Sequence, residues 1–534
     1  MTALSEHADP VLARMADAIL IPPFPGRSAP RWFLEALSRG LAGVTLFGPN
    51  IATPEQVSAL TASLRSAASA GSASAFAASA SGASASASAD PVIAIDEEGG
   101  DVTRVAYADG SPYPGNAALG AVDDVVLTQA VYRAIGRDLA ALGINFDLAP
   151  CADVLGSADS PAVGTRSFGA DTGLVSRHTA AAVAGLQSAG VAACVKHFPG
   201  HGRTGTDTHF AMATIEGGVA ELRQRDLPPF AAAIRAGTIA VMPSHLRVPE
   251  LTGDLPATVS GAALTGLLRG ELGFTGVIVS DALEMRAVRD RFGVPGAAVL
   301  AVAAGTDLLC LGRDSDEAEY LAVRSALVDA VRDGTISGTR LEDAADRVAR
   351  LRGGLARTRS HGSYGFSAAG LGVAAGLVPD GVGLVPDGVG LVPDGVGLVA
   401  ARRAVRSSGP RTTLSRPLII EVEPLENIAA GRFGWGLGPW VPAGSVRRVD
   451  AGDGEAPGIL AAAAGRSLVA VVRDAHRDAN TRSLVSRLLA ARPDTVLVEM
   501  GLPRWQPPDG TSYVATYGAS RASAQAAAEL LGLA

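Results

Sequence analysis

The sequence predicts an α/β protein with two domains. A chain of 534 residues exceeds the size that one hydrophobic core usually supports. Short apolar runs alternate with helical patterns, which is typical of parallel sheets covered by helices. Residues 376–399 interrupt this alternation by repeating GLVPDGV, in which Gly and Pro recur too often for a helix or a regular strand. We therefore expect a first domain over residues 1–355, a Gly- and Pro-rich linker over 356–410, and a second domain over 411–534.

Eight apolar runs in the first domain predict buried strands. They lie at residues 17–23, 43–48, 91–96, 143–150, 191–198, 239–246, 276–283 and 306–312. Helical patterns between them lie at 124–141, 172–189, 217–236 and 315–333. Eight such units in this length are typical of a (β/α)8 barrel, also called a TIM barrel, and a doubly wound open sheet is the structural alternative.

Two more stretches complete the expected organisation. Residues 66–90 are almost entirely Ala and Ser, which gives too little apolar bulk for a core and predicts a flexible loop before the third strand. Beyond the linker, apolar runs and helical patterns predict a smaller α/β sandwich. Its expected strands are 416–423, 467–474, 495–501 and 512–518, and its expected helices are 479–492 and 520–533.

Composition excludes several classes of protein. The formal net charge is −8 and no block of Lys and Arg stands out, so we expect no nucleic-acid partner. The three cysteines, Cys151, Cys194 and Cys310, show no paired spacing, which indicates a reducing compartment. The first residues lack the pattern of a signal peptide, and no apolar run is long enough to span a bilayer. We expect a cytoplasmic protein with no membrane contact.

Polar side chains follow the expected strands where each strand ends. Asp96, Lys196, His197, His245 and Asp281 all lie at the carboxyl ends of such runs. Active sites of (β/α)8 barrels form at this end, from the loops that lead into the helices. The sequence therefore predicts a site built from these side chains.

The loop CVKHFPGHGRTGTDTH, residues 194–209, is the richest in reactive groups. It holds Lys196, the one lysine among 45 lysines and arginines, and three of the eight histidines. Asp207 and His209 are two residues apart, so an extended loop places both side chains on one side. An aspartate beside an imidazole fixes its tautomer, and we expect a mobile loop that carries this pair as a proton shuttle.

A zinc site is the alternative for this loop. Its four possible ligands are His197, His201, Asp207 and His209. No helix can align the first two of these, because Pro199 and Gly200 lie between them. The sequence therefore favours the proton shuttle, and we expect no metal and no cofactor.

Further polar groups lie in three more stretches. GFTGVIVSDALEM, residues 273–285, delivers Asp281 to the end of a strand, although an aspartate there also commonly caps a helix. DEEGGDVTR, residues 96–104, adds Asp96 and Arg104, and GTRSFG adds Arg166. Carboxylates and cations without a phosphate-binding glycine motif suit a neutral ligand with many hydroxyls.

These motifs resemble the β-N-acetylglucosaminidase branch of glycoside hydrolase family 3. The resemblance rests on KHFPGHG followed by D-x-H, and on IDEEGG…R, RSFG and LGFTGVIVSDALEM, in this order. It covers residues 10–355, and the second domain resembles that of the two-domain members more weakly. The resemblance implies a (β/α)8 barrel that hydrolyses a small GlcNAc-containing carbohydrate without a cofactor.

The resemblance also implies a role for each matching residue. Asp281 falls on the nucleophile, and His209 falls on the acid/base, with Asp207 as its partner. The residues on substrate-binding positions are Asp96, Arg104, Arg166, Lys196 and His197, with His245 and Met285 lining the pocket. Members of the family often have a second aspartate after the nucleophile, where this chain has Ala282.

The expected activity is that of a retaining exo-β-N-acetylglucosaminidase, a β-N-acetylhexosaminidase. The expected substrates are muropeptide fragments or related oligosaccharides, as in cytoplasmic peptidoglycan recycling. A phosphorylase acting on β-N-acetylglucosaminides or β-glucosides is an alternative, because a histidine acid/base does not repel phosphate as a carboxylate would. A non-catalytic sugar-binding protein and a metal-dependent hydrolase, which a chelator would inactivate, are two further classes that the motifs leave open.

Overall fold

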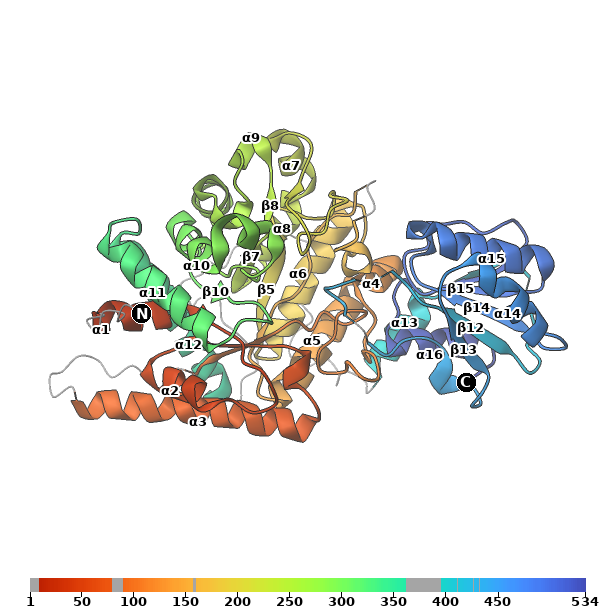
Figure 1. The fold of residues 1–534 in the computed structure, drawn as a ribbon, viewed down its shortest axis with the longest axis horizontal. Coiled ribbons are helices and arrows are strands. Elements are labelled where there is room, and N and C mark those ends of the chain that lie inside the picture. The colour runs from red at the N-terminus through yellow and green to blue at the C-terminus, as the bar shows by residue number, and fades with distance from the viewer. Residues whose placement is uncertain are drawn as a thin grey trace.

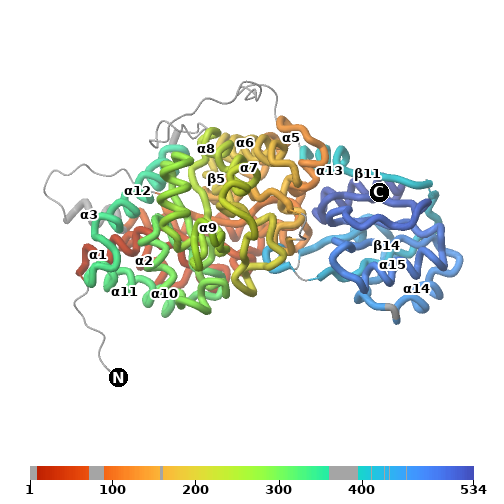
Figure 2. Tube along the Cα trace, turned by 90° about the horizontal axis from the view of Figure 1, so that it is seen from above, coloured from red at the N-terminus to blue at the C-terminus, as the bar shows by residue number. Residues whose placement is uncertain are grey.

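The computed structural model describes residues 9–78, 90–156, 160–361, 395–410, 412–425, 427–431 and 433–534. The chain forms two domains that lie side by side, one up to residue 361 and one from residue 395 (Figures 1 and 2). In these ranges no helix combines the length and the apolar character needed to cross a membrane.

The first domain contains parallel strands within all eight expected runs. They are β1 (Leu20–Ile21), β2 (Gly43–Leu46), β3 (Val92–Ile95), β4 (Phe146–Asp147), β5 (Ala192–Phe198), β7 (Ala240–Pro243), β9 (Val277–Ile278) and β10 (Leu309–Cys310). Strands β2, β3, β4, β5, β7 and β9 pair in this order, and β10 pairs with β1. A bridge between Val279 and Leu308 joins the two sets.

The strand ring closes between β1 and β2 through a side chain. The Thr45 hydroxyl donates to the Ile21 carbonyl at 3.2 Å, so these strands are neighbours without a backbone ladder among the described residues. All seven residues of β5 are buried, as expected for a strand inside a ring of helices. The expected α/β fold with a TIM-like first domain is confirmed.

Helices surround the strands (Figure 1). They are α1 (Pro10–Asp17), α2 (Arg31–Arg39), α3 (Pro54–Ala78), α4 (Asn116–Val122), α5 (Val125–Ala141), α6 (Thr172–Ser188), α7 (Val219–Arg225), α8 (Leu227–Arg235), α9 (Pro249–Thr252), α10 (Arg286–Ala304), α11 (Glu317–Arg332) and α12 (Gly338–His361), with the helical segment η4 (Ala262–Glu271). Aspartates at the first positions accept backbone N–H groups and fix several starts: Asp124 at α5, Asp171 at α6 and Asp316 at α11. The expected helix over 217–236 is two helices, because prolines begin α8 after Asp226.

The expected loop over residues 66–90 is wrong for its first half. Residues 66–78 continue α3, which begins at Pro54. Alanine has the highest helix propensity, and a helix that has already formed extends at little further cost. Low apolar content therefore does not exclude a helix. Residues 79–89 lie outside the described residues.

The expected linker over 356–410 is also structured at both ends. Helix α12 continues to His361, and residues 362–394 lie outside the described residues. Residues from Val396 form α13 (Val396–Ala404) and β11 (Arg406–Ser408). Helix α13 packs on α4 of the barrel and on α16 (Arg521–Leu530) of the second domain. The end of the repeat is helical because this packing buries Val396 and stabilises the turn that it begins.

The second domain is a sheet between two layers of helices. Its described strands are β11, β12 (Leu418–Val422), β13 (Val446–Val449), β14 (Leu468–Val472), β15 (Val496–Glu499) and β16 (Ser512–Ala515), in the order β11-β16-β15-β14-β12-β13. The β11–β16 pair is antiparallel, and the four remaining pairs are parallel. Alternate residues of β12 and β14 enter two separate cores, one with α14 (Ala456–Ala462) and α15 (Ala479–Ala491) and one with α16. The expected α/β sandwich is confirmed.

One buried carboxylate joins the two domains. Asp101, in the loop after β3, accepts the Thr165 hydroxyl at 2.8 Å and the Arg473 guanidinium at 3.2 Å on one oxygen. Its other oxygen accepts the backbone N–H of Ala519 at 2.7 Å. Val102 beside it enters the second domain's core. The loop after β3 therefore contacts the second domain through both charge and apolar packing.

Candidate active site

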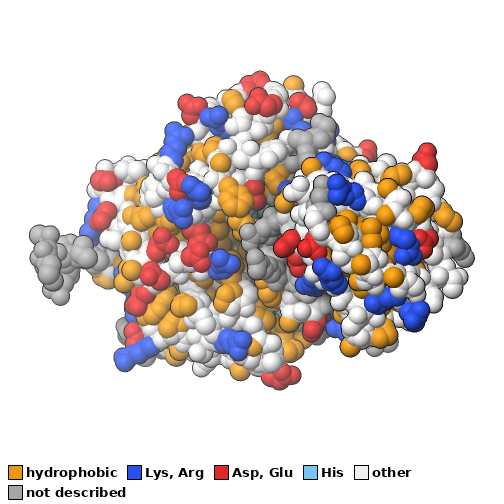
Figure 3. Space-filling model, turned by 45° about the vertical axis from the view of Figure 1, so that its right-hand side comes forward, with side chains coloured by type: hydrophobic (Ala, Val, Ile, Leu, Met, Phe, Trp, Pro, Cys, Tyr) orange, Lys and Arg blue, Asp and Glu red, His pale blue; other side chains and the backbone are white. Residues whose placement is uncertain are grey.

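The carboxyl ends of the barrel strands surround a cavity of about 800 Å³. Eight of the ten residues predicted from the sequence line it: Asp96, Arg104, Arg166, Lys196, His197, His209, Asp281 and Met285. The face where the two domains meet is hollowed, with acidic and basic side chains around the hollow (Figure 3). Parallel strands that end at one edge bring these distant residues together.

Lys196 sits between two carboxylates on the floor of the cavity. Its Nζ lies 2.6 Å from Asp96 Oδ1 and 2.9 Å from Glu98 Oε1. Burial alone would lower the pKa of Lys196, but the charges of Asp96 and Glu98 raise it well above its usual value. The lysine is therefore a permanent cation that cannot act as a base, and it can donate to a hydroxyl.

Arg166 completes this charged group and shares the Oε1 atom of Glu98 with Lys196. Its Nε and Nη2 donate to the two oxygens of Glu98 at 2.9 and 2.6 Å. Burial alone would raise the pKa of Glu98, but Arg166 and Lys196 hold it well below its usual range. Glu98 therefore fixes both cations. Sequence reasoning missed this role, although Glu98 belongs to the DEEGG run that could have indicated it.

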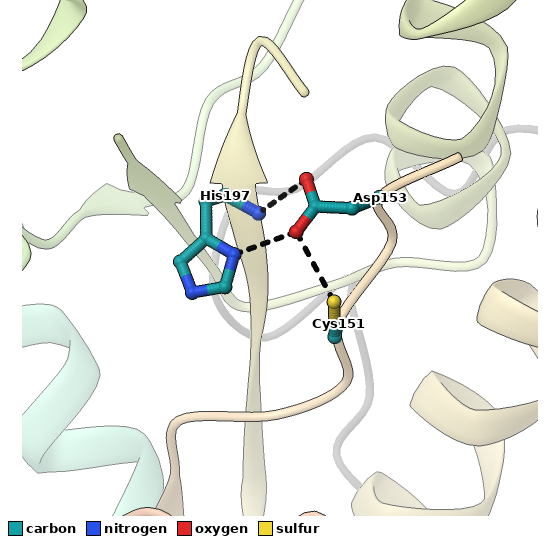
Figure 4. A group of neighbouring side chains, drawn as sticks. All are labelled: Cys151, Asp153 and His197. Atoms are coloured by element: carbon teal, nitrogen blue, oxygen red, sulfur yellow. Dashed lines mark hydrogen bonds and ion pairs between the residues drawn. The ribbon is translucent and has the colours of Figure 1, made fainter. Parts of the chain in front are cut away.

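His197 is held by a chain of buried groups (Figure 4). Its Nδ1 lies 2.7 Å from Asp153 Oδ2, which also accepts the Cys151 thiol at 3.1 Å. The other oxygen of Asp153 accepts the backbone N–H groups of His197 and His201. Because Nδ1–H donates to the carboxylate, Nε2 of His197 is directed toward Arg166, 3.3 Å away. Asp153 follows an expected strand in the sequence, but no motif indicates this role for it.

The same three side chains are the group among the described residues that could hold a metal ion. The donor atoms of Cys151, Asp153 and His197 lie within 4.8 Å of one another. Hydrogen bonds account for their contacts at 2.7 and 3.1 Å. The alternative zinc ligands of the loop, which included His201, Asp207 and His209, are not brought together as such a group in the described part of the chain.

Asp281 follows β9 and faces the cavity. Its Oδ1 accepts the backbone N–H of Ala282 at 2.8 Å. Burial alone would raise the pKa of Asp281, but the neighbouring imidazoles of His245 and His197 and the hydrogen bond from Ala282 lower it. The carboxylate is therefore ionised at neutral pH, which is the form that a nucleophile needs.

His245 does not line the cavity, which corrects the role expected for it. Its side chain is 0% exposed, and Nε2 donates to the Ala282 carbonyl at 3.0 Å. Nδ1 lies 2.8 Å from the Thr258 hydroxyl. A position at the end of a strand does not fix which way a ring points, and here it points into the protein. His245 therefore holds the backbone that carries Asp281.

His209 and Asp207 form the expected pair in the loop after β5. His209 Nδ1 and its backbone N–H both donate to Asp207 Oδ1, at 2.7 and 2.9 Å. The His209 side chain is 27% exposed and lines the cavity. Burial alone would raise the pKa of Asp207, but the hydrogen bond from His209 lowers it. With Nδ1 occupied, Nε2 is the nitrogen that can exchange a proton with a substrate.

Residues of the second domain also line the cavity. They are Ile428, Ala429 and Gly431, and Ala429 accepts a hydrogen bond from Arg104. The sequence offered no signal for them, because no motif marks the segment. The outer part of the cavity contains further groups that sequence reasoning missed: Phe47, Tyr107, Arg286, Arg289, Arg313 and Glu319.

Comparison with known proteins assigns the family. A model of the glycosyl hydrolase family 3 N-terminal domain matches residues 35–351. The chain belongs to glycosyl hydrolase family 3. A family 3 β-N-acetylglucosaminidase structure from Paenibacillus sp. str. FPU-7 matches with a TM-score of 0.78 and 30% identity, over 99% of this chain and 97% of that one.

Curated relatives in the family are named β-hexosaminidases. The one from Stenotrophomonas maltophilia (strain K279a) is 36% identical over 303 residues, which cover 55% of this chain and 84% of the relative. β-Hexosaminidase A from Pseudoalteromonas piscicida is 31% identical over 339 residues, or 60% of this chain. This match spans about half, 54%, of the Pseudoalteromonas protein. The expected family and the expected enzyme class, a glycoside hydrolase of the β-N-acetylhexosaminidase type, are confirmed.

Proposed function

We propose that this family 3 enzyme is a retaining exo-β-N-acetylglucosaminidase that releases GlcNAc from muropeptide fragments or related oligosaccharides. One observation carries the proposal. An ionised carboxylate, Asp281, and an imidazole oriented by a carboxylate, His209, face the same cavity. A nucleophile and an oriented proton shuttle around one substrate are the two groups that a retaining glycosidase needs.

The proposed reaction has two steps. Asp281 attacks the anomeric carbon, and the bond to the leaving oxygen breaks as His209 Nε2–H protonates that oxygen. In the second step His209 takes a proton from water, the water oxygen attacks the anomeric carbon, and the bond to Asp281 breaks. Asp207 balances the charge of the imidazolium, which is present before the first proton transfer and forms again after the second. Lys196, Arg166 and Asp96 are placed to bind ring hydroxyls.

Trapping the covalent intermediate tests this mechanism. In His209→Ala, an aryl β-GlcNAc with a good leaving group should still glycosylate Asp281, while the second step lacks its base. Mass spectrometry of the quenched enzyme should then find one GlcNAc unit on the peptide that contains Asp281. An unmodified Asp281 peptide during turnover, or release of the α-anomer as the first product, would contradict the proposal.

The muropeptide part of the proposal is supported by arginines in the outer cavity. Arg286, Arg289 and Arg313 line it, and muropeptides carry carboxylates beyond the GlcNAc unit. The Arg313 side chain is 62% exposed and contacts Asp314 at 3.3 Å, a surface pair of little strength. An acidic leaving group can therefore replace Asp314 as the partner of Arg313.

The substrate proposal is tested with Arg313→Ala. We expect kcat/KM for GlcNAc–anhydro-MurNAc to fall roughly three- to tenfold, and kcat/KM for the neutral disaccharide chitobiose to stay unchanged. Arg235→Ala, an exposed arginine at the end of α8, is the matched control. Equal losses on both substrates would contradict an acidic leaving group.

Phosphorolysis on the same site is the second candidate. His209 favours it, because an imidazole does not repel a phosphate that enters for the second step. Products are compared with and without phosphate, and GlcNAc-1-phosphate would identify a phosphorylase. Sugar binding by calorimetry with no turnover of any substrate would instead identify a non-catalytic protein.

The cytoplasmic location stays a prediction, and cell fractionation tests it.

A further inference from the structure

A segment of the second domain reaches into the barrel's cavity. Residues 427–431 follow β12, and Ile428, Ala429 and Gly431 line the cavity beside Arg104. The site therefore includes residues that are more than three hundred positions from the loop they contact. This contact raises the question of what the second domain does for substrate binding.

Arg104 is held at both ends. Its backbone N–H donates to Glu97 Oε2 at 2.8 Å, which fixes the start of the side chain. Its Nη2 donates to the Ala429 carbonyl at 2.8 Å and lies 3.9 Å from Asp96 Oδ2. An arginine loses much rotamer freedom when it binds a ligand, so a carbonyl that already fixes the guanidinium reduces this cost. The guanidinium carries five N–H donors, so it can also donate into the cavity.

The segment itself is anchored to the barrel. Asn427 Nδ2 donates to the Pro161 carbonyl at 3.2 Å, and its Oδ1 accepts the backbone N–H of Ala430 at 3.3 Å. The Gly431 N–H donates to the Asn427 carbonyl at 2.8 Å. Gly431 has φ +68°, and a Cβ there would meet the Tyr107 ring at 3.4 Å. This turn sets the position of the Ala429 carbonyl relative to Arg104.

We propose that the second domain positions Arg104 for the GlcNAc unit through the Ala429 carbonyl, with Asn427 as the residue that holds the segment in place. This inference rests on the proposed function for the identity of the sugar. Asn427 is a positioning residue, because it acts on substrate only through Arg104. Loss of its anchor leaves every barrel residue intact and frees the guanidinium to adopt other rotamers.

The test compares Asn427→Ala with the unmodified enzyme in the full chain. We expect KM for an aryl β-GlcNAc and the inhibition constant of GlcNAc to rise together by roughly three- to tenfold, with kcat unchanged within about twofold. Asn480→Ala, an exposed asparagine in the same domain, is the matched control and should change neither constant. Asn427→Asp keeps an acceptor for Ala430, removes the donor to Pro161, and should act in the same direction if Asn427→Ala does not fold.

A double-mutant cycle distinguishes positioning from general loosening of the domain. In an Arg104→Gln background, Asn427→Ala should change KM and the inhibition constant by less than about twofold. The inference would be overturned if Asn427→Ala changed KM by the same factor in the unmodified enzyme and in Arg104→Gln. It would also be overturned if Asn427→Ala left KM of the otherwise unmodified enzyme unchanged. Calorimetric binding of GlcNAc gives the same comparison without turnover, so failure of the proposed hydrolase function is recognised separately.

Discussion

The ammonium of Lys196 lies 2.6 Å from Asp96 Oδ1 while its side chain is only 2% exposed. A compact cation fits this position because Arg166 Nη2 already contacts the same Glu98 oxygen, Oε1, at 2.6 Å. A guanidinium is wider, and it would have to displace Arg166 or lose Asp96. We expect Lys196→Arg to lower kcat/KM for an aryl β-GlcNAc by at least about tenfold, although its charge is unchanged.

Arg166→Lys is the reciprocal control, since it keeps the charge but gives up the two-point contact with Glu98. It should also lose activity, and steady-state kinetics on both variants measures the effect. If Lys196→Arg kept its kcat/KM, the site would not require a lysine at this position, and the single lysine of the chain would have no chemical explanation.

His209→Ala should discriminate between leaving groups. A poor leaving group needs the proton from His209, whereas a dinitrophenolate leaves without it. We expect kcat/KM to fall by about 10²- to 10⁴-fold on an alkyl β-GlcNAc and by less than about tenfold on the dinitrophenyl compound. The measurement is a series of substrates ordered by leaving-group pKa. Parallel losses across the series would contradict His209 as the acid.

His201 should make stability depend on pH. Burial lowers its pKa from an ordinary value of 6.5 to about 4, although Asp153 opposes this shift. The unfolded chain binds the proton between these values and the folded chain does not, so stability is complete above about pH 6.5 and falls toward pH 4. Between pH 7 and 5 the loss due to this residue should be about 2 kcal/mol.

Denaturant unfolding at several pH values measures this contribution in the unmodified enzyme and in His201→Gln. Other carboxylates titrate in the same range, so only the difference in slope between the two proteins is assigned to His201. Identical pH slopes would show that the imidazole titrates in the folded protein as it does in the unfolded chain, which would contradict the lowered pKa. Its buried Nδ1 has no hydrogen-bond partner among the described residues, which is consistent with a neutral ring.

The group of Cys151, Asp153 and His197 should work without a metal. Its contacts have hydrogen-bond lengths, so dialysis against a chelator should leave kcat/KM unchanged. Cys151→Ala should cost less than about threefold in activity, because Asp153 keeps its bond to His197. Asp153→Asn should cost more, since it weakens the bond that orients the ring. Loss of activity on chelation that added zinc restores would contradict this interpretation.

The barrel was predictable because its strands are continuous apolar runs, and so were residues that stand at strand ends, such as Asp281 and Lys196. Side-chain direction was not predictable, which is why His245 was expected in the cavity although it points away. Residues 66–78 are helical because of the high helix propensity of alanine, although their low apolar content predicted a loop. The contact between Arg104 and Ala429 joins residues that are far apart in the sequence, so no local sequence pattern predicts it.

The loop after β3 contains both Asp96, which faces the cavity, and Asp101, which accepts a hydrogen-bond donor from each domain. Asp96, which lines the cavity, therefore lies only five positions before Asp101, which connects the two domains. An insertion or deletion in this loop that changes the pocket also shifts Asp101 and its contacts with both domains. The loop therefore cannot change freely when a new substrate specificity evolves. Sequence differences that change the substrate range should accordingly concentrate around Arg286 and Arg313 in the outer cavity, because these residues lie outside the loop that also connects the domains.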